Sequence, residues 1–177
     1  LPESRTQDLS IFDQLMGGIR YFDLRPKYDS DDDAYYTYHG PSTGESITDV
    51  LADVANFMEN EQSNELVILK FSHFKDFGDD SKSSSVYVTF ITQVKDALED
   101  YLLGVEHSTK LGTLTMNQMV GDEGKVIVVC SDNYPLHNGT NGIYVYRDGD
   151  LTCNQEARDD DPRQGNLVVW DCYSNST

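Results

Sequence analysis

Continuous apolar runs that alternate with helical patterns constrain the fold of this chain more than any other feature. The runs are LVILKF at 66–71, KVIVV at 125–129 and LVVW at 167–170. Strands of this kind are usually covered on both faces, as in parallel sheets flanked by helices. Between the runs, residues 46–61 and 84–104 carry apolar side chains at helical spacing. The alternation predicts an α/β fold with a parallel sheet, open or closed.

Two further strands are predicted in the first quarter of the chain, GIRYFDLR at 18–25 and YYTYHG at 35–40. The polar stretch between them, residues 26–34, is too short for a crossover helix. Fully extended, it spans about 30 Å, so we expect it to return along the sheet and let the second strand begin again in parallel. Residues 74–85 and 132–165 are predicted as loops.

The net charge of the chain excludes one broad class of function. The 177 residues suggest a single domain, and they carry a formal charge of -18 with a sequence pI near 4.3. That balance excludes a general nucleic-acid binder. It also disfavours a polybasic grip on an anionic membrane, although one cationic pocket can still hold one anionic headgroup. No apolar run approaches the roughly 20 residues of a spanning helix, and the opening LPESRTQDLS does not resemble a signal peptide.

Cysteine usage and two sequons favour an extracellular or lumenal location. Cys130, Cys153 and Cys172 follow no zinc spacing, so we expect one disulfide and one spare thiol, with the pairing left open. The sequons begin at Asn138 and Asn175. About one sequon arises by chance in a chain of this length, so the two add only modest support for a secreted glycoprotein.

Polar side chains gather where the predicted strands end. In parallel α/β folds, the chemistry collects at the carboxyl ends of the strands. Four predicted strands end in residue types that do acid–base work, which is more consistent than scatter. They are Asp23 and Arg25, then His39, then Lys70, Ser72 and His73, and finally Asp171 and Tyr173. Strand alternation also places Asp23 and Arg25 on one face, opposite Leu24.

The stretches that carry these residues resemble one known family. QLMGGIRYFDLRP at 14–26, YYTYHG at 35–40, ELVILKFSHF at 65–74 and VVWDCYS at 168–174 are similar to the X domain of phosphatidylinositol-specific phospholipases C. The likeness is to the metal-independent branch, with its secreted bacterial enzymes and small X-domain-only eukaryotic relatives. It implies a distorted TIM barrel that works at a membrane surface without a cofactor. The reaction implied is cleavage of phosphatidylinositol to diacylglycerol and a cyclic inositol phosphate.

The resemblance also implies a role for each polar residue. His39 matches the general acid that protonates the departing diacylglycerol oxygen, and Asp23 lies near it and favours its imidazolium form. Arg25 holds the phosphate and neutralises the charge that builds on its oxygens. Asp171 contacts the inositol hydroxyls, and Tyr173 stacks on the ring.

No metal is expected at this site. In the calcium-dependent branch, acidic residues stand at the positions of Arg25 and Ser72, where they help to bind the ion. Here the guanidinium of Arg25 supplies the positive charge. Lys70 stands where many X-domain-only relatives have an acid, and we assign Lys70 and Ser72 to substrate binding, with a structural role for Lys70 as an equal alternative. His73 matches a histidine frequent in the same relatives, and no mechanism is assigned to it.

One residue of the family has no counterpart in this chain. The family's general-base histidine lies on the first barrel strand, before the segment that matches residues 6–15. His107 and His137 are interpreted as surface histidines, so neither replaces it. We therefore expect residues 1–177 to form one phospholipase-like domain that is incomplete at both ends, with five barrel strands. Such a chain should be inactive by itself and should need the remainder of its barrel as a partner.

Two alternatives to this lipid-cleaving enzyme stay open. Another phosphodiesterase barrel, of the glycerophosphodiesterase or sphingomyelinase-D type, pairs acids around a metal and places HD after its strand. This chain has Arg25 and the pair His39-Gly40 instead. The second alternative is a non-catalytic secreted relative that binds phospholipid or glycan. Among inositol lipids, the unphosphorylated headgroup is favoured because few basic residues other than Arg25 and Lys70 are placed near the site.

Overall fold

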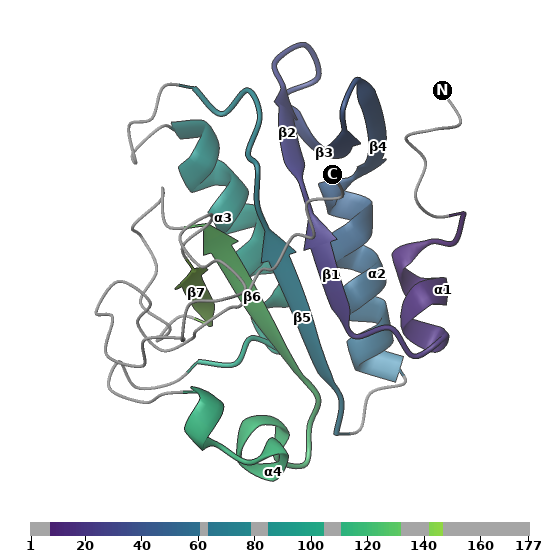
Figure 1. The fold of residues 1–177 in the computed structure, drawn as a ribbon, viewed down its shortest axis with the longest axis vertical. Coiled ribbons are helices and arrows are strands. Elements are labelled where there is room, and N and C mark those ends of the chain that lie inside the picture. The colour runs from purple at the N-terminus through teal and green to yellow at the C-terminus, as the bar shows by residue number, and fades with distance from the viewer. Residues whose placement is uncertain (1–7, 61–63, 79–84, 105–110, 132–141, 147–177) are drawn as a thin grey trace, which may run out of the picture.

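A four-stranded parallel sheet forms the centre of the structure, a computed structural model that describes residues 8–60, 64–78, 85–104, 111–131 and 142–146. The strands are β1 (Tyr21–Leu24), β5 (Leu66–Phe71), β6 (Lys125–Ser131) and β7 (Ile143–Tyr146), in the order β1-β5-β6-β7 (Figure 1). The predicted α/β class with a parallel sheet is confirmed. Over the described residues the four strands form an open sheet and do not close into a barrel.

A second sheet contradicts one prediction. Strands β2 (Pro26–Asp29), β3 (Ala34–His39) and β4 (Ser42–Ser46) form an antiparallel sheet of their own. The prediction that residues 35–40 form another parallel strand is therefore wrong. The reason is local: the backbone at Asp33 has φ 52, and the hydroxyl of Tyr28 donates to its carboxylate at 2.9 Å. These contacts close a tight hairpin, so residues 26–29 pair with the next strand and do not return along the sheet.

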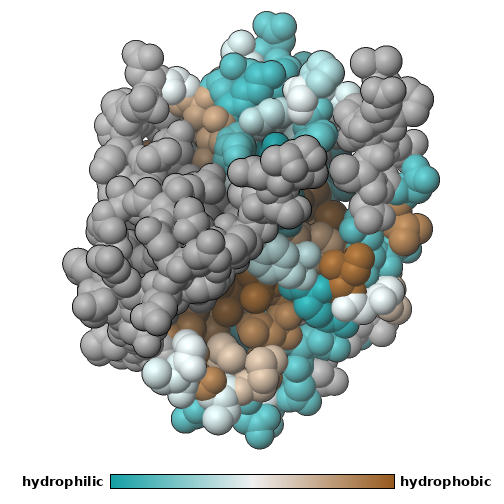
Figure 2. Space-filling view, in the orientation of Figure 1, coloured by the Kyte–Doolittle hydropathy of each residue, from teal (hydrophilic) through white to brown (hydrophobic). Residues whose placement is uncertain are grey.

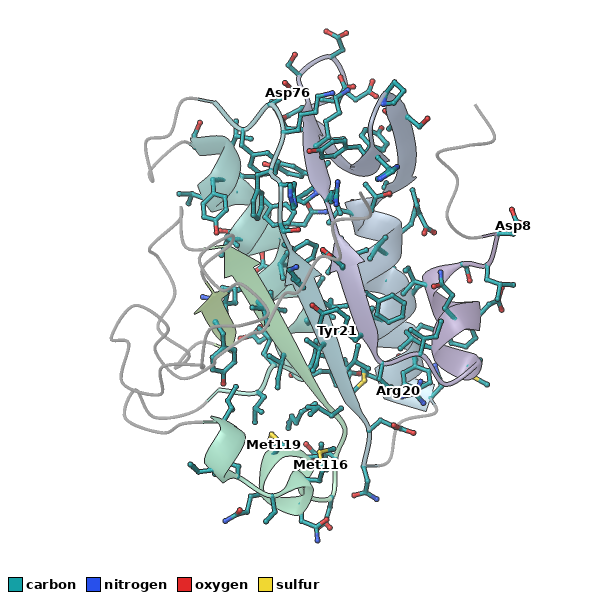
Figure 3. All side chains as sticks on the ribbon, viewed as in Figure 1. Asp8, Arg20, Tyr21, Asp76, Met116 and Met119 are labelled. Atoms are coloured by element: carbon teal, nitrogen blue, oxygen red, sulfur yellow. The ribbon has the colours of Figure 1, made fainter. Side chains whose placement is uncertain are left out.

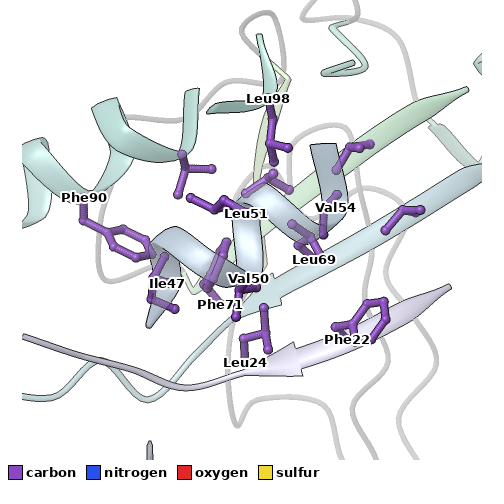
Figure 4. Packing of buried hydrophobic residues seen from close by; sticks show 14 of the residues in the cluster. Phe22, Leu24, Ile47, Val50, Leu51, Val54, Leu69, Phe71, Phe90 and Leu98 are labelled. Atoms are coloured by element: carbon purple, nitrogen blue, oxygen red, sulfur yellow. The ribbon is translucent and has the colours of Figure 1, made fainter. Parts of the chain in front are cut away.

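Helices cover the face of the parallel sheet on which Phe22 and Leu24 are buried. The two predicted long helices are confirmed as α2 (Ile47–Asn60) and α3 (Ser85–Leu98), and a short helix α1 (Ile11–Met16) packs beside α2 (Figure 1). Figure 4 shows how the apolar stripe of α2 fits against the strands. The residues labelled there on α2, β1 and β5 are Ile47, Val50, Leu51, Val54, Phe22, Leu24, Leu69 and Phe71.

A smaller apolar cluster occupies the opposite face of the sheet. Strand alternation sends Val126, Val128 and Cys130 into the main core, and it sends Ile127 and Val129 to the other side. There they meet Leu103, Leu111 and Tyr144. Figure 2 shows apolar atoms gathered on this side of the molecule, in the lower middle of the view. A 3-10 turn (Leu111–Thr113) and the short helix α4 (Met116–Val120) lie at the amino end of β6, where Met116 and Met119 are labelled in Figure 3.

Strand β7 lies in a segment that was predicted as a loop. Its four residues, IYVY, follow Gly142, whose φ is 78. Their β-branched and aromatic side chains favour a strand, but a run of four is too short to separate from loop sequence by periodicity. The predicted strand at 166–174 lies outside the described residues. Within the described ranges, no helix is long and apolar enough to cross a membrane.

Candidate active site

A cavity of about 1110 Å³ opens at the carboxyl end of β1. It is bounded by β1, by the hairpin of β3 and β4, and by the residues around α1. Asp23, Arg25 and His39 all line it, so the structure brings together the three residues predicted to be catalytic. Glu45 and the exposed Tyr21, which is labelled in Figure 3, line the same cavity.

Strand alternation places the first two of these residues as predicted. Phe22 and Leu24 are buried under α2, whereas Tyr21 and Asp23 are exposed on the other face of β1. Arg25 follows at the single position between β1 and β2 and is half-buried. The chain turns there from one sheet into the other, so Arg25 stands at the junction of the two sheets.

Two side chains hold the carboxylate of Asp23. One is Lys70 of β5, and the other is Ser72, which directly follows β5. The Lys70 ammonium lies 3.4 Å from Oδ2 of Asp23, and the Ser72 hydroxyl donates to Oδ1 at 3.0 Å. Both β5-side residues are buried, Lys70 at 1% exposure and Ser72 at 0%. Neither is among the residues that line the cavity as the structure describes it. Their predicted contact with substrate stays a prediction.

A hydrogen-bonded chain continues from Ser72 to His73. Nδ1 of His73 lies 3.0 Å from the Ser72 oxygen. Because an ionised carboxylate only accepts hydrogen bonds, the Ser72 proton points to Asp23, and Ser72 then accepts from the Nδ1–H of His73. The backbone of His73 has φ 54, which is unusual for a residue with a side chain. The end of β5 is thus fixed around Asp23.

Tyr38 ties His39 to the rest of the site. Its backbone N–H donates to the carbonyl of Arg25 at 2.9 Å, and its hydroxyl donates to the carbonyl of His73 at 2.6 Å. Burial raises the pKa of the Tyr38 phenol, while the nearby positive charge of Arg25 acts in the opposite direction. His39, the next residue, ends β3 with its side chain exposed at the cavity.

Sequence reasoning missed Glu45, which lies in β4 and lines the cavity. The side chain is exposed at the cavity, and partial loss of water around its carboxyl raises the pKa above the usual range; the negative charges of Asp53 and Asp49 raise it further. The polar stretch STGES that contains it carries no pattern of its own. Only the pairing of β3 with β4 brings Glu45 to the cavity.

Several predicted residues cannot be placed. Asp171 and Tyr173 lie outside the described residues, as do His107, His137, Cys153, Cys172 and the sequons at Asn138 and Asn175. Cys130 is a buried free thiol of β6, and burial raises its pKa to about 12. Among the residues that the structure describes, no group of three or more His, Cys, Asp or Glu side chains is arranged to hold a metal ion.

Curated proteins resemble this chain in sequence, although no family model matches it. A PI-PLC X-box domain-containing protein of Dictyostelium discoideum is 37% identical over 81 residues, which are 46% of this chain and 10% of that protein. The variant-surface-glycoprotein phospholipase C of Trypanosoma brucei brucei is 36% identical over 101 residues, which are 56% of this chain and 26% of that protein. The chain therefore spans about a quarter of the length of these relatives or less.

Solved structures of bacterial phospholipases share the fold. The phosphatidylinositol-specific phospholipase C of Staphylococcus aureus superposes with a TM-score of 0.53 at 16% identity, over 72% of this chain and 40% of that one. A calcium-dependent phosphoinositol-specific phospholipase C from Pseudomonas sp. gives a TM-score of 0.54 at 16% identity, over 78% of this chain and 60% of that one. The fold is thus shared with at least one calcium-dependent enzyme, so fold likeness alone says nothing about a metal.

The strand-end residues, the parallel sheet with its flanking helices and the curated matches all agree. The chain is similar in sequence to X-domain proteins of the phosphatidylinositol-specific phospholipase C type, and it shares its fold with bacterial phospholipases C.

Proposed function

We propose that this protein cleaves the phosphodiester of phosphatidylinositol to diacylglycerol and a cyclic inositol phosphate by general acid–base catalysis. The observation that carries the proposal is the meeting of Asp23, Arg25 and His39 at one cavity. The names of the sequence relatives support the same substrate class. The acidic chain, its cysteines and its sequons support action on the extracellular or lumenal side of a membrane.

The proposed step forms one P–O bond and breaks another. The inositol 2-hydroxyl attacks the phosphorus, the bond from phosphorus to the glycerol oxygen breaks, and His39 delivers a proton to that oxygen as diacylglycerol leaves. Arg25 binds the phosphate oxygens through its planar guanidinium and offsets their growing charge. By resemblance to the family, the proton of the attacking hydroxyl goes to a histidine that is not among the described residues.

His39→Ala tests the role of the general acid. We expect this variant to lose about 10²–10⁴-fold in activity on phosphatidylinositol. On a nitrophenyl phosphodiester of inositol, the loss should be much smaller because that leaving group departs with little need of a proton. Rates of product release from lipid vesicles and from the chromogenic substrate give the comparison. Equal losses on both substrates would show that His39 is structural.

The donor groups at the cavity do not fit a calcium ion. Calcium takes six to eight oxygen ligands, with carboxylates prominent among them. Both oxygens of Asp23 already receive hydrogen bonds from Lys70 and Ser72, and the positive charge of Arg25 lines the same space. We therefore propose that Arg25 takes the place of a metal.

Removal of calcium tests this part of the proposal. Activity on phosphatidylinositol should be unchanged in excess EGTA, whereas Arg25→Lys should lose most of it because a point ammonium cannot reproduce the two-pronged contact to phosphate. Vesicle assays with and without EGTA, followed by added calcium, make the measurement. Activity that disappears with EGTA and returns with calcium would contradict a metal-free mechanism.

A non-catalytic relative that binds the headgroup is the second candidate. It is favoured by the fact that His39 is the one histidine among the described residues that line the cavity. Such a protein would bind vesicles that contain phosphatidylinositol and release no inositol phosphate from them.

A further inference from the structure

Lys70 carries a charge in a position where lysines are rare. Its side chain is 1% exposed and stands inside the apolar run of β5. In the register of the two strands it is the direct partner of Asp23 on β1. Because an ammonium that leaves water is strongly destabilised unless an anion lies near it, the carboxylate of Asp23 at 3.4 Å is a contact that keeps this lysine charged.

The Lys70–Asp23 pair lies at the wall of the cavity, and Asp23 is the residue of the pair that faces it. The side chain of Asp23 is 37% exposed and lines the cavity, whereas Lys70 lies behind it, out of contact with water. Towards the cavity, the Lys70–Asp23 pair therefore presents no net charge. Ser72 holds the other carboxylate oxygen, so the carboxylate stays against β5.

Arg25 lines the same cavity two residues further along the chain. Within the ranges described by the structure, no carboxylate forms an ion pair with Arg25. If Asp23 were not neutralised from behind, its negative charge would offset much of the attraction of Arg25 for an anion. In a protein of formal charge -18, the local charge balance at the cavity matters for the approach of an anion.

We infer that Lys70 is a positioning residue that neutralises Asp23 and so keeps this carboxylate from offsetting the positive charge of Arg25 at the cavity. This inference rests on the proposed function, because it identifies the phosphate-bearing headgroup as the anion. It also assigns Lys70 a part that neither predicted role contained. Lys70 would touch no substrate atom, yet it would determine the preference of the site for a charged ligand over a neutral one.

Binding of a charged and a neutral probe separates this role from the others. The probes are myo-inositol 1-phosphate and myo-inositol, titrated by calorimetry at low ionic strength, where surface fields are least screened. We expect Lys70→Met to weaken the phosphate probe about tenfold, since an unbalanced carboxylate then faces the anion, and to leave the neutral probe within about twofold. Methionine keeps the length and apolar character of the lysine stem, so the variant should fold. Lys70→Gln repeats the test if it does not.

The double variant Asp23→Asn with Lys70→Met is the decisive comparison. It removes both charges, so the phosphate probe should bind again within about threefold of the natural protein. Ser72→Ala is the matched control, because it removes a hydrogen bond of Asp23 without a change in charge and should affect both probes equally.

Four results would overturn the inference. A double variant that stays as weak as Lys70→Met would mean that Lys70 touches the phosphate itself. Equal weakening of both probes by Lys70→Met would mean that its role is packing alone. A natural protein that binds neither probe would overturn the proposed function as well, whereas unchanged phosphate binding in Lys70→Met would overturn only the inference.

Discussion

The surroundings of Glu45 disfavour the negative charge of its ionised carboxylate. Partial loss of water around its carboxyl at the cavity is the main reason why its pKa is raised from the ordinary value of 4.5, and the carboxylates of Asp53 and Asp49 add to the effect. A raised carboxyl pKa means that the folded state holds the proton more tightly than the unfolded chain does. At neutral pH, ionised Glu45 therefore lowers the stability of the fold.

Glu45→Gln should raise the free energy of unfolding at pH 7. The gain should shrink as the pH falls towards 4.5, the ordinary value, and should vanish below it, because the natural glutamate is then protonated in both states. Urea unfolding across this pH range measures it. A gain that persists undiminished at pH values about one unit below 4.5 would show that the charge is not its source.

Glu65→Gln provides a control of opposite sign. The hydrogen bond from Arg20 lowers the pKa of Glu65, so its ionised form stabilises the fold above its ordinary pKa, and this contribution is lost as the pH falls through the lowered value. The variant should therefore be less stable than the natural protein at neutral pH and should approach it in acid.

Among the helices and strands, those with a clear apolar periodicity were predicted correctly from the sequence. The long helices α2 and α3 and the strands β1, β5 and β6 follow from apolar spacing. Strand β3 also exists where it was predicted, but its partner and direction were wrong. Those depend on the hairpin closed at Asp33, and periodicity carries no information about which strand a segment pairs with.

In the candidate site too, the sequence identified individual residues but not the contacts between distant strands. Asp23, Arg25 and His39 were found from their positions at strand ends and from the family resemblance, and they do share a cavity. The bond of Lys70 to Asp23 was not foreseen. It joins residues 47 positions apart in the chain, and only the register of β1 against β5 brings them together.

The junction of β4 with α2 is a separate point where one side chain secures an element. The hydroxyl of Ser46 accepts a hydrogen bond from the backbone N–H of Asp49 at 3.1 Å, which satisfies one of the first N–H groups of the helix. Ser46→Ala should lower the free energy of unfolding by about 1 kcal/mol, measured by urea denaturation. Ser46→Thr keeps the acceptor and should restore most of it. An unchanged midpoint in the alanine variant would contradict the capping role.

For the whole molecule, the ends of the sheet matter most. β1 and β7 are the outermost strands of the described sheet, and an outer strand presents backbone groups that can pair with another chain. Apolar side chains near β1 are exposed, Ile19 at 39% and Tyr21 at 48%. Both features favour association of residues 1–177 when these are produced alone.

We expect residues 1–177 alone to self-associate and to release no inositol phosphate from phosphatidylinositol vesicles. Light scattering after size exclusion measures the first property, and the vesicle assay measures the second. Ile19→Lys should reduce the association because a charge beside an outer strand discourages pairing. A monomer that turns over lipid would overturn both expectations and would place a general base within these residues.

The direct passage from β1 into β2 has a consequence for how related proteins diverge. Arg25 fills the single position between the strands, and the main chain of Tyr38 bonds to its carbonyl at 2.9 Å, one residue before His39. This backbone hydrogen bond fixes the main chain at Arg25 relative to the main chain just before His39. A relative can therefore change the residues of the cavity wall while this backbone spacing stays the same. A one-residue insertion between Leu24 and Pro26 would break this spacing, because it would change the position of Arg25 relative to His39.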